Sequence, residues 1–155
     1  MALWWTLILA AVFTLPSCLY LWPAGYDMAG AAHLVTFLAA VILRTRVGRG
    51  ARKQERRPSR TGLAVGAAAG ALGALGSAAV SHSVPANTAF LAYLAQRGVP
   101  APAAVTLHAL YAAPTALLTA LIAAVFYGVV GAFAAWWGAK PWRRLPPQLK
   151  EDPST

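Results

Sequence analysis

The chain has 155 residues, of which 59% are hydrophobic and only 11% are charged, and its formal net charge is +9. A soluble domain carries about a quarter charged residues to solvate its surface, so this composition excludes an ordinary soluble globular protein. The basic residues are also segregated: eight lie between Arg44 and Arg60, four between Lys140 and Lys150, and Arg97 stands alone. A bilayer imposes such segregation, because a Lys or Arg at the centre of a membrane helix costs about 2.5–3.5 kcal/mol.

The first predicted unit, residues 1–43, is a hairpin of two transmembrane helices. Ala2 to Trp22 is long enough to cross roughly 30 Å of hydrocarbon at about 1.5 Å per residue, and Pro16 should kink it. Pro23–Gly25 is a turn signal. The second helix is expected from Tyr26 to Leu43, which is short for a span.

Residues 44–60 are predicted to form a basic cytoplasmic loop, mobile rather than folded because it contains Gly48, Gly50 and Pro58. Its position between two apolar segments favours anionic lipid headgroups over nucleic acid as the partner. The side chains expected to contact headgroups are Arg44, Arg46, Arg49, Arg52, Lys53, Arg56, Arg57 and Arg60.

The third predicted span, Thr61 to Val80, consists almost entirely of small residues. Glycines recur first every fourth and then every third position, which places them along one stripe of a helix; they are Gly62, Gly66, Gly70, Gly73 and Gly76. Small residues at this spacing let two helix backbones approach closely in lipid. We therefore expect the stripe to pack inside the bundle or against a partner, the alternative being a general bias of the composition toward Ala and Gly.

The remainder of the unit 61–140 is predicted to contain an outer segment, 81–113, and a fourth span. Within the outer segment a short helix, N-capped near Asn87–Thr88 and ended by Gly98, should lie at the interface or cap the bundle. Pro114 should break the following apolar run, which leaves Thr115 to Trp137 as the spanning part. Residues 141–155 are expected to form a cytoplasmic tail.

The predicted fold class is therefore all-α: a polytopic membrane protein with four transmembrane helices and a short outer interfacial helix. Because basic loops stay on the cytoplasmic side, the basic counts place both termini in the cytoplasm. The Ala-rich composition suggests a bacterial protein of the inner, cytoplasmic membrane.

This topology brings His33, His82, His108 and Asp27 to the outer side. Imidazoles from separate helices can bind a metal, ligate a haem or hydrogen-bond a quinone, and an ionisable group within a membrane helix is a candidate functional residue. His33 and His108 are the stronger candidates. No HxxxH or HExxH spacing supports a metal site, so a purely structural role for His33 and a solvated position for His82 remain alternatives.

Catalytic signatures are missing from the sequence. It has no paired carboxylates, no Gly-x-Ser-x-Gly turn and no phosphate-binding loop, so no catalytic residue or cofactor is assigned. Three functions remain open. The first is a non-catalytic accessory or scaffold subunit that joins a partner membrane protein or a second copy. The others are a haem-, metal- or quinone-binding protein using His33 and His108, and a small oligomeric transporter or channel.

Overall fold

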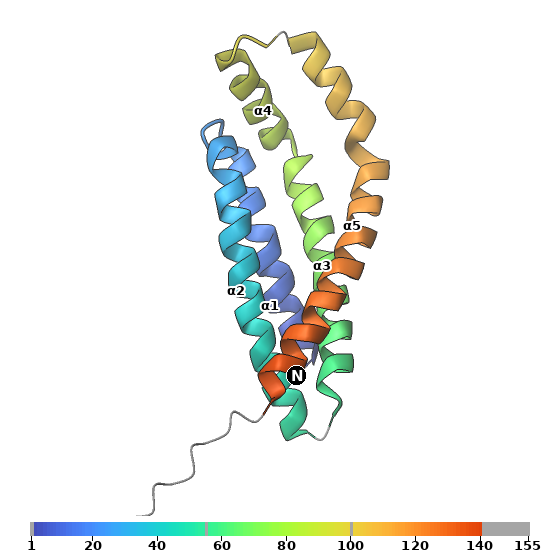
Figure 1. The fold of residues 1–155 in the computed structure, drawn as a ribbon. Coiled ribbons are helices and arrows are strands. Elements are labelled where there is room, and N and C mark those ends of the chain that lie inside the picture. Colours follow the sequence, from blue (N-terminus) through green and yellow to red (C-terminus); the bar gives the residue numbers. More distant parts are fainter. Residues whose placement is uncertain (1, 55, 100, 141–155) are drawn as a thin grey trace, which may run out of the picture.

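The computed structural model describes residues 2–54, 56–99 and 101–140, and for residues 101–114 it describes the backbone alone. These residues form α1 (Ala2–Thr14), the 3₁₀ helix η1 (Leu15–Leu21), α2 (Gly25–Lys53), α3 (Pro58–Ser81), α4 (Val84–Gln96) and α5 (Ala101–Ala139). Figure 1 shows an elongated bundle in which α4 lies at one end. The predicted all-α class is confirmed over the described residues.

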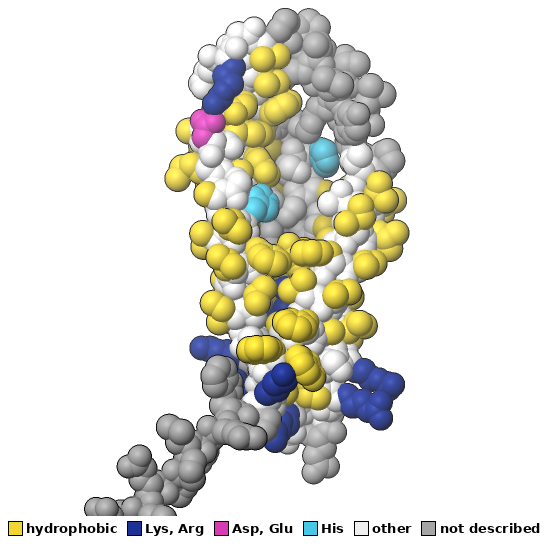
Figure 2. Space-filling view, in the orientation of Figure 1, with side chains coloured by type: hydrophobic (Ala, Val, Ile, Leu, Met, Phe, Trp, Pro, Cys, Tyr) yellow, Lys and Arg dark blue, Asp and Glu magenta, His cyan; other side chains and the backbone are white. Residues whose placement is uncertain are grey.

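Four segments are long and apolar enough to cross a membrane: Ala2–Leu21, Gly25–Lys53, Pro58–Ser81 and Thr115–Ala139. Their outer surfaces are apolar, as Figure 2 shows over the middle of the molecule. On α5, large side chains at every fourth position are 62–70% exposed; they are Leu117, Leu121, Val125 and Val129. Such a continuous apolar surface is unfavourable in water and suits lipid. The chain is thus a multi-pass membrane protein, as predicted.

The two ends of the bundle differ in charge. At one end, called here the basic end, α2 and α5 finish and α1 and α3 begin, and the dark blue side chains gather there in Figure 2. At the other, called the α4 end, α4 lies near the turn between η1 and α2. Tyr26 of α2 packs there against Phe90 and Tyr93 of α4, with ring centroids 5.5 and 4.9 Å apart. The short helix therefore caps the bundle.

The glycine stripe of α3 lies inside the molecule. A Cβ atom on Gly62 or Gly66 would overlap backbone carbonyls of α5, and one on Gly70 would come within 2.6 Å of the Ala123 carbonyl oxygen. Gly73 and Gly76 instead face α1, where a Cβ would lie 2.6 Å from the side chains of Phe13 and Thr14. The stripe thus sets how closely α3 approaches its two neighbours.

The first span changes helix type at its proline. The α-helix ends at Thr14, and Leu15–Leu21 continue as a 3₁₀ helix with Pro16 near its start. Proline has no N–H to donate and its ring crowds the preceding turn, so the regular α-helical hydrogen bonding stops at the position where a kink was predicted.

The predicted basic loop is largely helical. Helix α2 continues ten residues beyond Leu43 to Lys53, and the turn before α3 is short. Gly48, read as a sign of mobility, is a packing position, because a Cβ there would overlap the Ala135 carbonyl of α5. Gly138 makes the reciprocal approach to Thr45. Close contact between α2 and α5 therefore accounts for order in residues 44–53.

Two further expectations about the second half of the chain differ from the structure. Helix α4 begins at Val84, with Ser83 as its N-cap, rather than near Asn87; the Ser83 hydroxyl accepts a hydrogen bond from the Ala86 N–H at 3.5 Å. Helix α5 runs through Pro114 without ending. Membrane helices tolerate an internal proline when its freed carbonyl is satisfied nearby.

Candidate ligand-binding cavity

A cavity of about 330 Å³ lies among the four spanning segments, in the half of the bundle toward the α4 end. Along α3 its wall extends from Gly70 to His82, roughly 18 Å of helix at 1.5 Å per residue. Figure 2 shows histidine side chains, in cyan, beside the hollow. The full lining of this bundle cavity is Phe13, Ser17, Tyr20, His33, Thr36, Gly70, Gly73, Ala74, Ser77, Ala78, Ser81, His82, Thr115, Ala116, Thr119, Ala123 and Tyr127.

His33 enters the cavity from α2 with one ring nitrogen already engaged. Its Nδ1 lies 2.7 Å from the carbonyl oxygen of Ala29. A carbonyl oxygen only accepts, so Nδ1 carries the proton and donates it. In the neutral ring this leaves Nε2 as a hydrogen-bond acceptor. The Tyr20 ring lies beside the imidazole, with the two centroids 6.1 Å apart.

Several hydroxyl groups of the wall also use their protons within the protein. Thr36 donates to Ala32 at 2.8 Å, Ser77 to Phe13 at 3.3 Å and Ser81 to Ala78 at 3.2 Å, each to a backbone carbonyl oxygen. Their oxygens remain able to accept. The wall therefore offers a ligand mainly acceptors at these positions.

Ser17 differs from these three hydroxyl groups. Its side chain is 1% exposed, and its Oγ has no hydrogen-bond partner among the described residues. A buried hydroxyl without a partner costs about 1–3 kcal/mol. Ser17 thus supplies one group that is able to donate to a bound molecule.

The floor of the cavity is a pair of aromatic rings. Phe13 of α1 and Tyr127 of α5 have ring centroids 4.2 Å apart at an interplanar angle of 33°. The other lining residues of the first span, Ser17 and Tyr20, and of α5, Thr115 to Ala123, lie on the α4 side of this pair along the chain.

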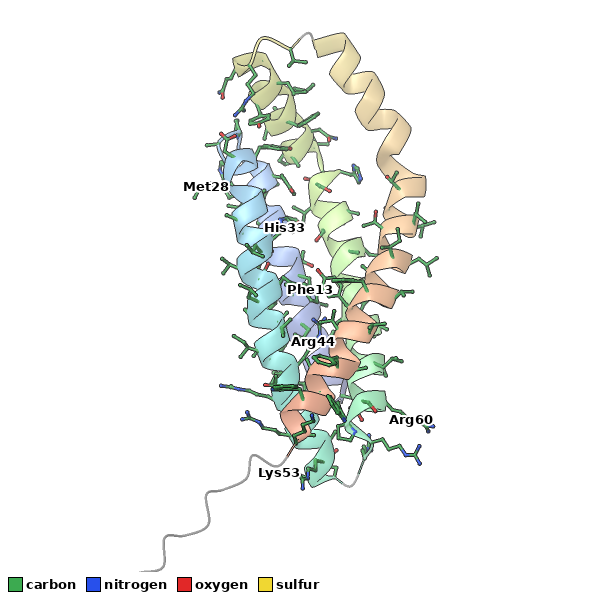
Figure 3. The ribbon with its side chains drawn as sticks, in the orientation of Figure 1. Phe13, Met28, His33, Arg44, Lys53 and Arg60 are labelled. Carbon is green, nitrogen blue, oxygen red and sulfur yellow. The ribbon has the colours of Figure 1, made fainter. Side chains whose placement is uncertain are left out.

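Arg44 lies beneath this floor, toward the basic end. Its guanidinium carbon Cζ is 5.0 Å from the centroid of each ring, and Figure 3 shows Arg44 directly below Phe13. The residue is only 1% exposed, and its three guanidinium nitrogens have no hydrogen-bond partner in the described part of the chain. Cation–π attraction to two rings is thus the interaction seen for this charge.

This position corrects one assignment made from sequence. Arg44 was expected at the lipid headgroups, but it lies inside the bundle, because α2 continues through it with its side chain on the inner face. The other seven residues of that set are exposed; they are Arg46, Arg49, Arg52, Lys53, Arg56, Arg57 and Arg60. Their contact with headgroups stays a prediction.

The buried position of Arg44 has a sequence signal that was missed. The inner stripe of α2 comprises Ala40, Arg44, Val47, Gly48 and Ala51, which follow the spacing of one helix face. Treating residues 44–53 as a loop hid that periodicity. The hydroxyl groups of the wall gave no comparable signal, because Ser and Thr occur on many helix faces.

The four acidic and histidine candidates fall in different places. His33 and His82 line the same cavity. Asp27 does not; it forms an ion pair with Arg97 at 2.7 Å, and Tyr93 donates a hydrogen bond to the same carboxylate at 3.4 Å. The side chain of His108 lies outside the described residues, so the proposed His33–His108 pairing stays a prediction. In the described parts of the chain, no group of three or more His, Cys, Asp or Glu is placed to hold a metal ion.

A second hollow lies at the basic end, with a volume of about 450 Å³. Its walls are the basic side chains Arg49, Arg52, Lys53 and Lys140 together with the end of α5. Arg52 donates to the carbonyl oxygen of Ala139 at 2.7 Å and so caps that helix. This open basic surface suits the predicted contact with anionic headgroups.

Comparison with protein-family models, with curated proteins and with solved structures finds no match to this chain. The chemistry of the bundle cavity therefore has to carry the functional argument by itself.

Proposed function

We propose that this chain is a multi-pass membrane protein that binds a small polar molecule in the bundle cavity. The observation that supports this is a partly open hollow of about 330 Å³, lined by all four spanning segments, whose mainly apolar wall carries several polar side chains. Helices that pack for stability alone would fill such a space with apolar side chains. Polar groups facing the interior of a membrane bundle are expensive and mark ligand or substrate sites.

The hydrogen-bonding state of the wall indicates the ligand's chemistry. His33 Nε2 and the oxygens of Thr36, Ser77 and Ser81 accept. A molecule with hydroxyl or amino donors would match them. An oxidised quinone offers only carbonyl acceptors, which could pair with the Ser17 hydroxyl but not with these acceptors. A metal would need more ligands than the two imidazoles of this wall. These groups therefore favour a polar organic ligand over the haem, metal or quinone expected from the sequence.

The two other expected functions stay predictions. The glycine stripe was expected to pack inside the bundle or against a partner, and its close approaches are to α5 and α1 of the same chain. An accessory subunit would be recognised by a stoichiometric partner after a native purification in mild detergent. A transporter would be recognised by solute flux into proteoliposomes.

We also propose that the basic end lies in the cytoplasm, and with it both termini, in the inner membrane of a bacterium. The exposed Arg and Lys side chains at that end support this orientation, because cytoplasmic loops carry an excess of such residues. The bundle cavity then lies in the outer half of the membrane, where a solute from outside the cell would reach it.

Cysteine labelling in lipid nanodiscs tests whether the cavity is a water-accessible site. In a Cys18→Ser background, Ser77→Cys places a thiol in the cavity wall, and Leu75→Cys places one on the lipid-facing side of the same helix. A small, hydrophilic, membrane-impermeant thiol reagent should modify Ser77→Cys and leave Leu75→Cys unmodified. Both thiols lie at nearly the same depth, so depth alone cannot explain a difference. Equal labelling at both, or none at Ser77→Cys, would contradict the proposal.

A further inference from the structure

Among the residues that the structure describes, no carboxylate forms an ion pair with Arg44. The sequence contains four acidic residues. Asp27 lies 17 residues before Arg44, about 26 Å along α2, and is paired with Arg97. The other three, Glu55, Glu151 and Asp152, fall outside the four spanning segments. A buried guanidinium without an anion is costly, so binding of an anionic molecule would relieve this cost.

We propose that Arg44 is the anion-recognising group of the bundle cavity, and that the ligand is a small carboxylate carrying a hydroxyl or amino donor. This rests on the proposed function and specifies its ligand class. The guanidinium would bind the carboxylate, and the acceptors near the α4 end would bind the donor at the ligand's other end. The acceptors line the cavity, and Arg44 lies beyond its floor, against the rings of Phe13 and Tyr127.

The position of Arg44 explains how its guanidinium could bind a ligand in the bundle cavity although Arg44 does not line that cavity. Phe13 and Tyr127 line the cavity and also contact the guanidinium, with Cζ 5.0 Å from both ring centroids. The ring faces hold the cation while no anion is present. Rotation of the Phe13 side chain removes one ring from between them, and a carboxylate then forms the bidentate contact that arginine favours.

The size of the cavity favours an organic anion over a halide. A volume of about 330 Å³ holds several water molecules, each occupying about 30 Å³ in the liquid, and lies at the lower end of small-molecule sites. A lone halide would leave most of it unfilled. The wall combines apolar patches, such as Ala74, Ala78 and Ala123, with its polar groups, which suits a compact body with a polar group at each end.

Binding of 4-hydroxybenzoate to the full chain in nanodiscs tests this inference, with neutral 4-hydroxybenzamide as the matched probe. Both carry the same ring and hydroxyl donor, so the difference between them isolates the carboxylate. The wild-type protein should prefer the carboxylate by about tenfold or more, the scale of one charge-assisted contact. In Arg44→Gln this preference should fall to about twofold or less. Arg46→Gln, on the exposed side of the same helix, should keep it.

If Arg44→Gln does not fold, Arg44→Lys can be used to test the same carboxylate preference. Lysine keeps the charge and loses the bidentate geometry, so the preference should fall without disappearing. A cavity-filling Ala74→Trp should abolish binding of both probes, whereas Ala79→Trp, exposed on the same helix, should not.

The outcomes separate this inference from the proposed function. Equal binding of both probes, lost only in Ala74→Trp, would overturn the role of Arg44 and leave the cavity as a ligand site. If Arg44→Gln or Arg44→Lys kept the wild-type preference for the carboxylate over the amide, the role of Arg44 would likewise be overturned. If neither probe binds but the reagent still labels Ser77→Cys, the ligand is not a carboxylate of this class. If neither probe binds and Ser77→Cys is not labelled, both proposals are overturned.

Discussion

Arg44 places a guanidinium about halfway along the bundle, where the surrounding helices exclude bulk water. Phe13, one of its two ring partners, lies 11 residues from the start of α1, roughly 16 Å from that end. Two desolvated cation–π contacts offset about 2 kcal/mol each. The effective cost of burying one ion is several kcal/mol, so the ligand-free protein carries a net penalty at this residue. Such a penalty is typical of a binding group.

Replacing that charge should therefore stabilise the protein in the absence of ligand. We expect Arg44→Met, which keeps the length of the side chain and its contact with the two rings, to raise the free energy of unfolding by about 1–4 kcal/mol. Thermal unfolding in the same detergent measures this, with Arg46→Met as the exposed control on α2. A loss of stability of similar size would show instead that Arg44 holds the bundle together.

At the scale of single elements, the most extensive helix contact among the described residues is between α3 and α5. Gly62 and Gly131 face each other, and a Cβ on either would overlap the backbone carbonyl of the other. Without a hydrophobic driving force in lipid, helices associate through dispersion contacts between backbones brought close by small residues. The long α3–α5 contact also positions two walls of the bundle cavity, so its packing supports the site.

A large side chain in this contact should separate the two helices. Gly66→Leu would push against the Tyr127 carbonyl and displace a ring of the cavity floor. Ala64→Leu, exposed on the same helix, should be tolerated. We expect a loss of about 1–3 kcal/mol for Gly66→Leu, the usual scale for overpacking, measured as a lower unfolding temperature. Equal tolerance at both positions would leave the glycines explained by composition alone.

The hydropathy of the sequence predicted the four spanning helices, but it did not predict the bundle cavity or the buried position of Arg44. Four apolar runs of about 20 residues gave the spans, because lipid requires a helix at each. The end of α2 was missed because Gly48 resembles a loop residue in sequence, and its packing against Ala135 depends on a helix distant in the chain. Arg44 was assigned to the surface with that loop. The cavity requires knowledge of which faces meet, which a single sequence did not provide.

At the scale of the whole molecule, charge and polarity divide the bundle along its length. Exposed basic residues gather at one end, the aromatic and ionic contacts of α4 close the other, and the polar cavity opens in the half near α4. This asymmetry gives each end a different environment, in keeping with a protein that receives its ligand from one side of the membrane.

Reporter fusions test the proposed orientation. A reporter active only in the cytoplasm should function when inserted at Pro58 or fused after Thr155, and should fail at Asn87. The physical reason is the retention of basic segments on the cytoplasmic side. Activity at Asn87 with silence at Pro58 would reverse the orientation, and the cavity would then face the cell interior.

Protection of the cavity thiol by ligand tests most directly whether the hollow is the binding site. The labelling rate of Ser77→Cys, in the Cys18→Ser background, should fall about tenfold at a concentration of 4-hydroxybenzoate ten times its Kd, because about a tenth of the sites then remain free. Adding Arg44→Gln should weaken binding about tenfold, so at that same concentration about half of the sites are free and the rate should recover to about half of its unprotected value. Full-rate labelling at saturating 4-hydroxybenzoate in the protein that retains Arg44 would contradict the account, because the ligand would then bind elsewhere.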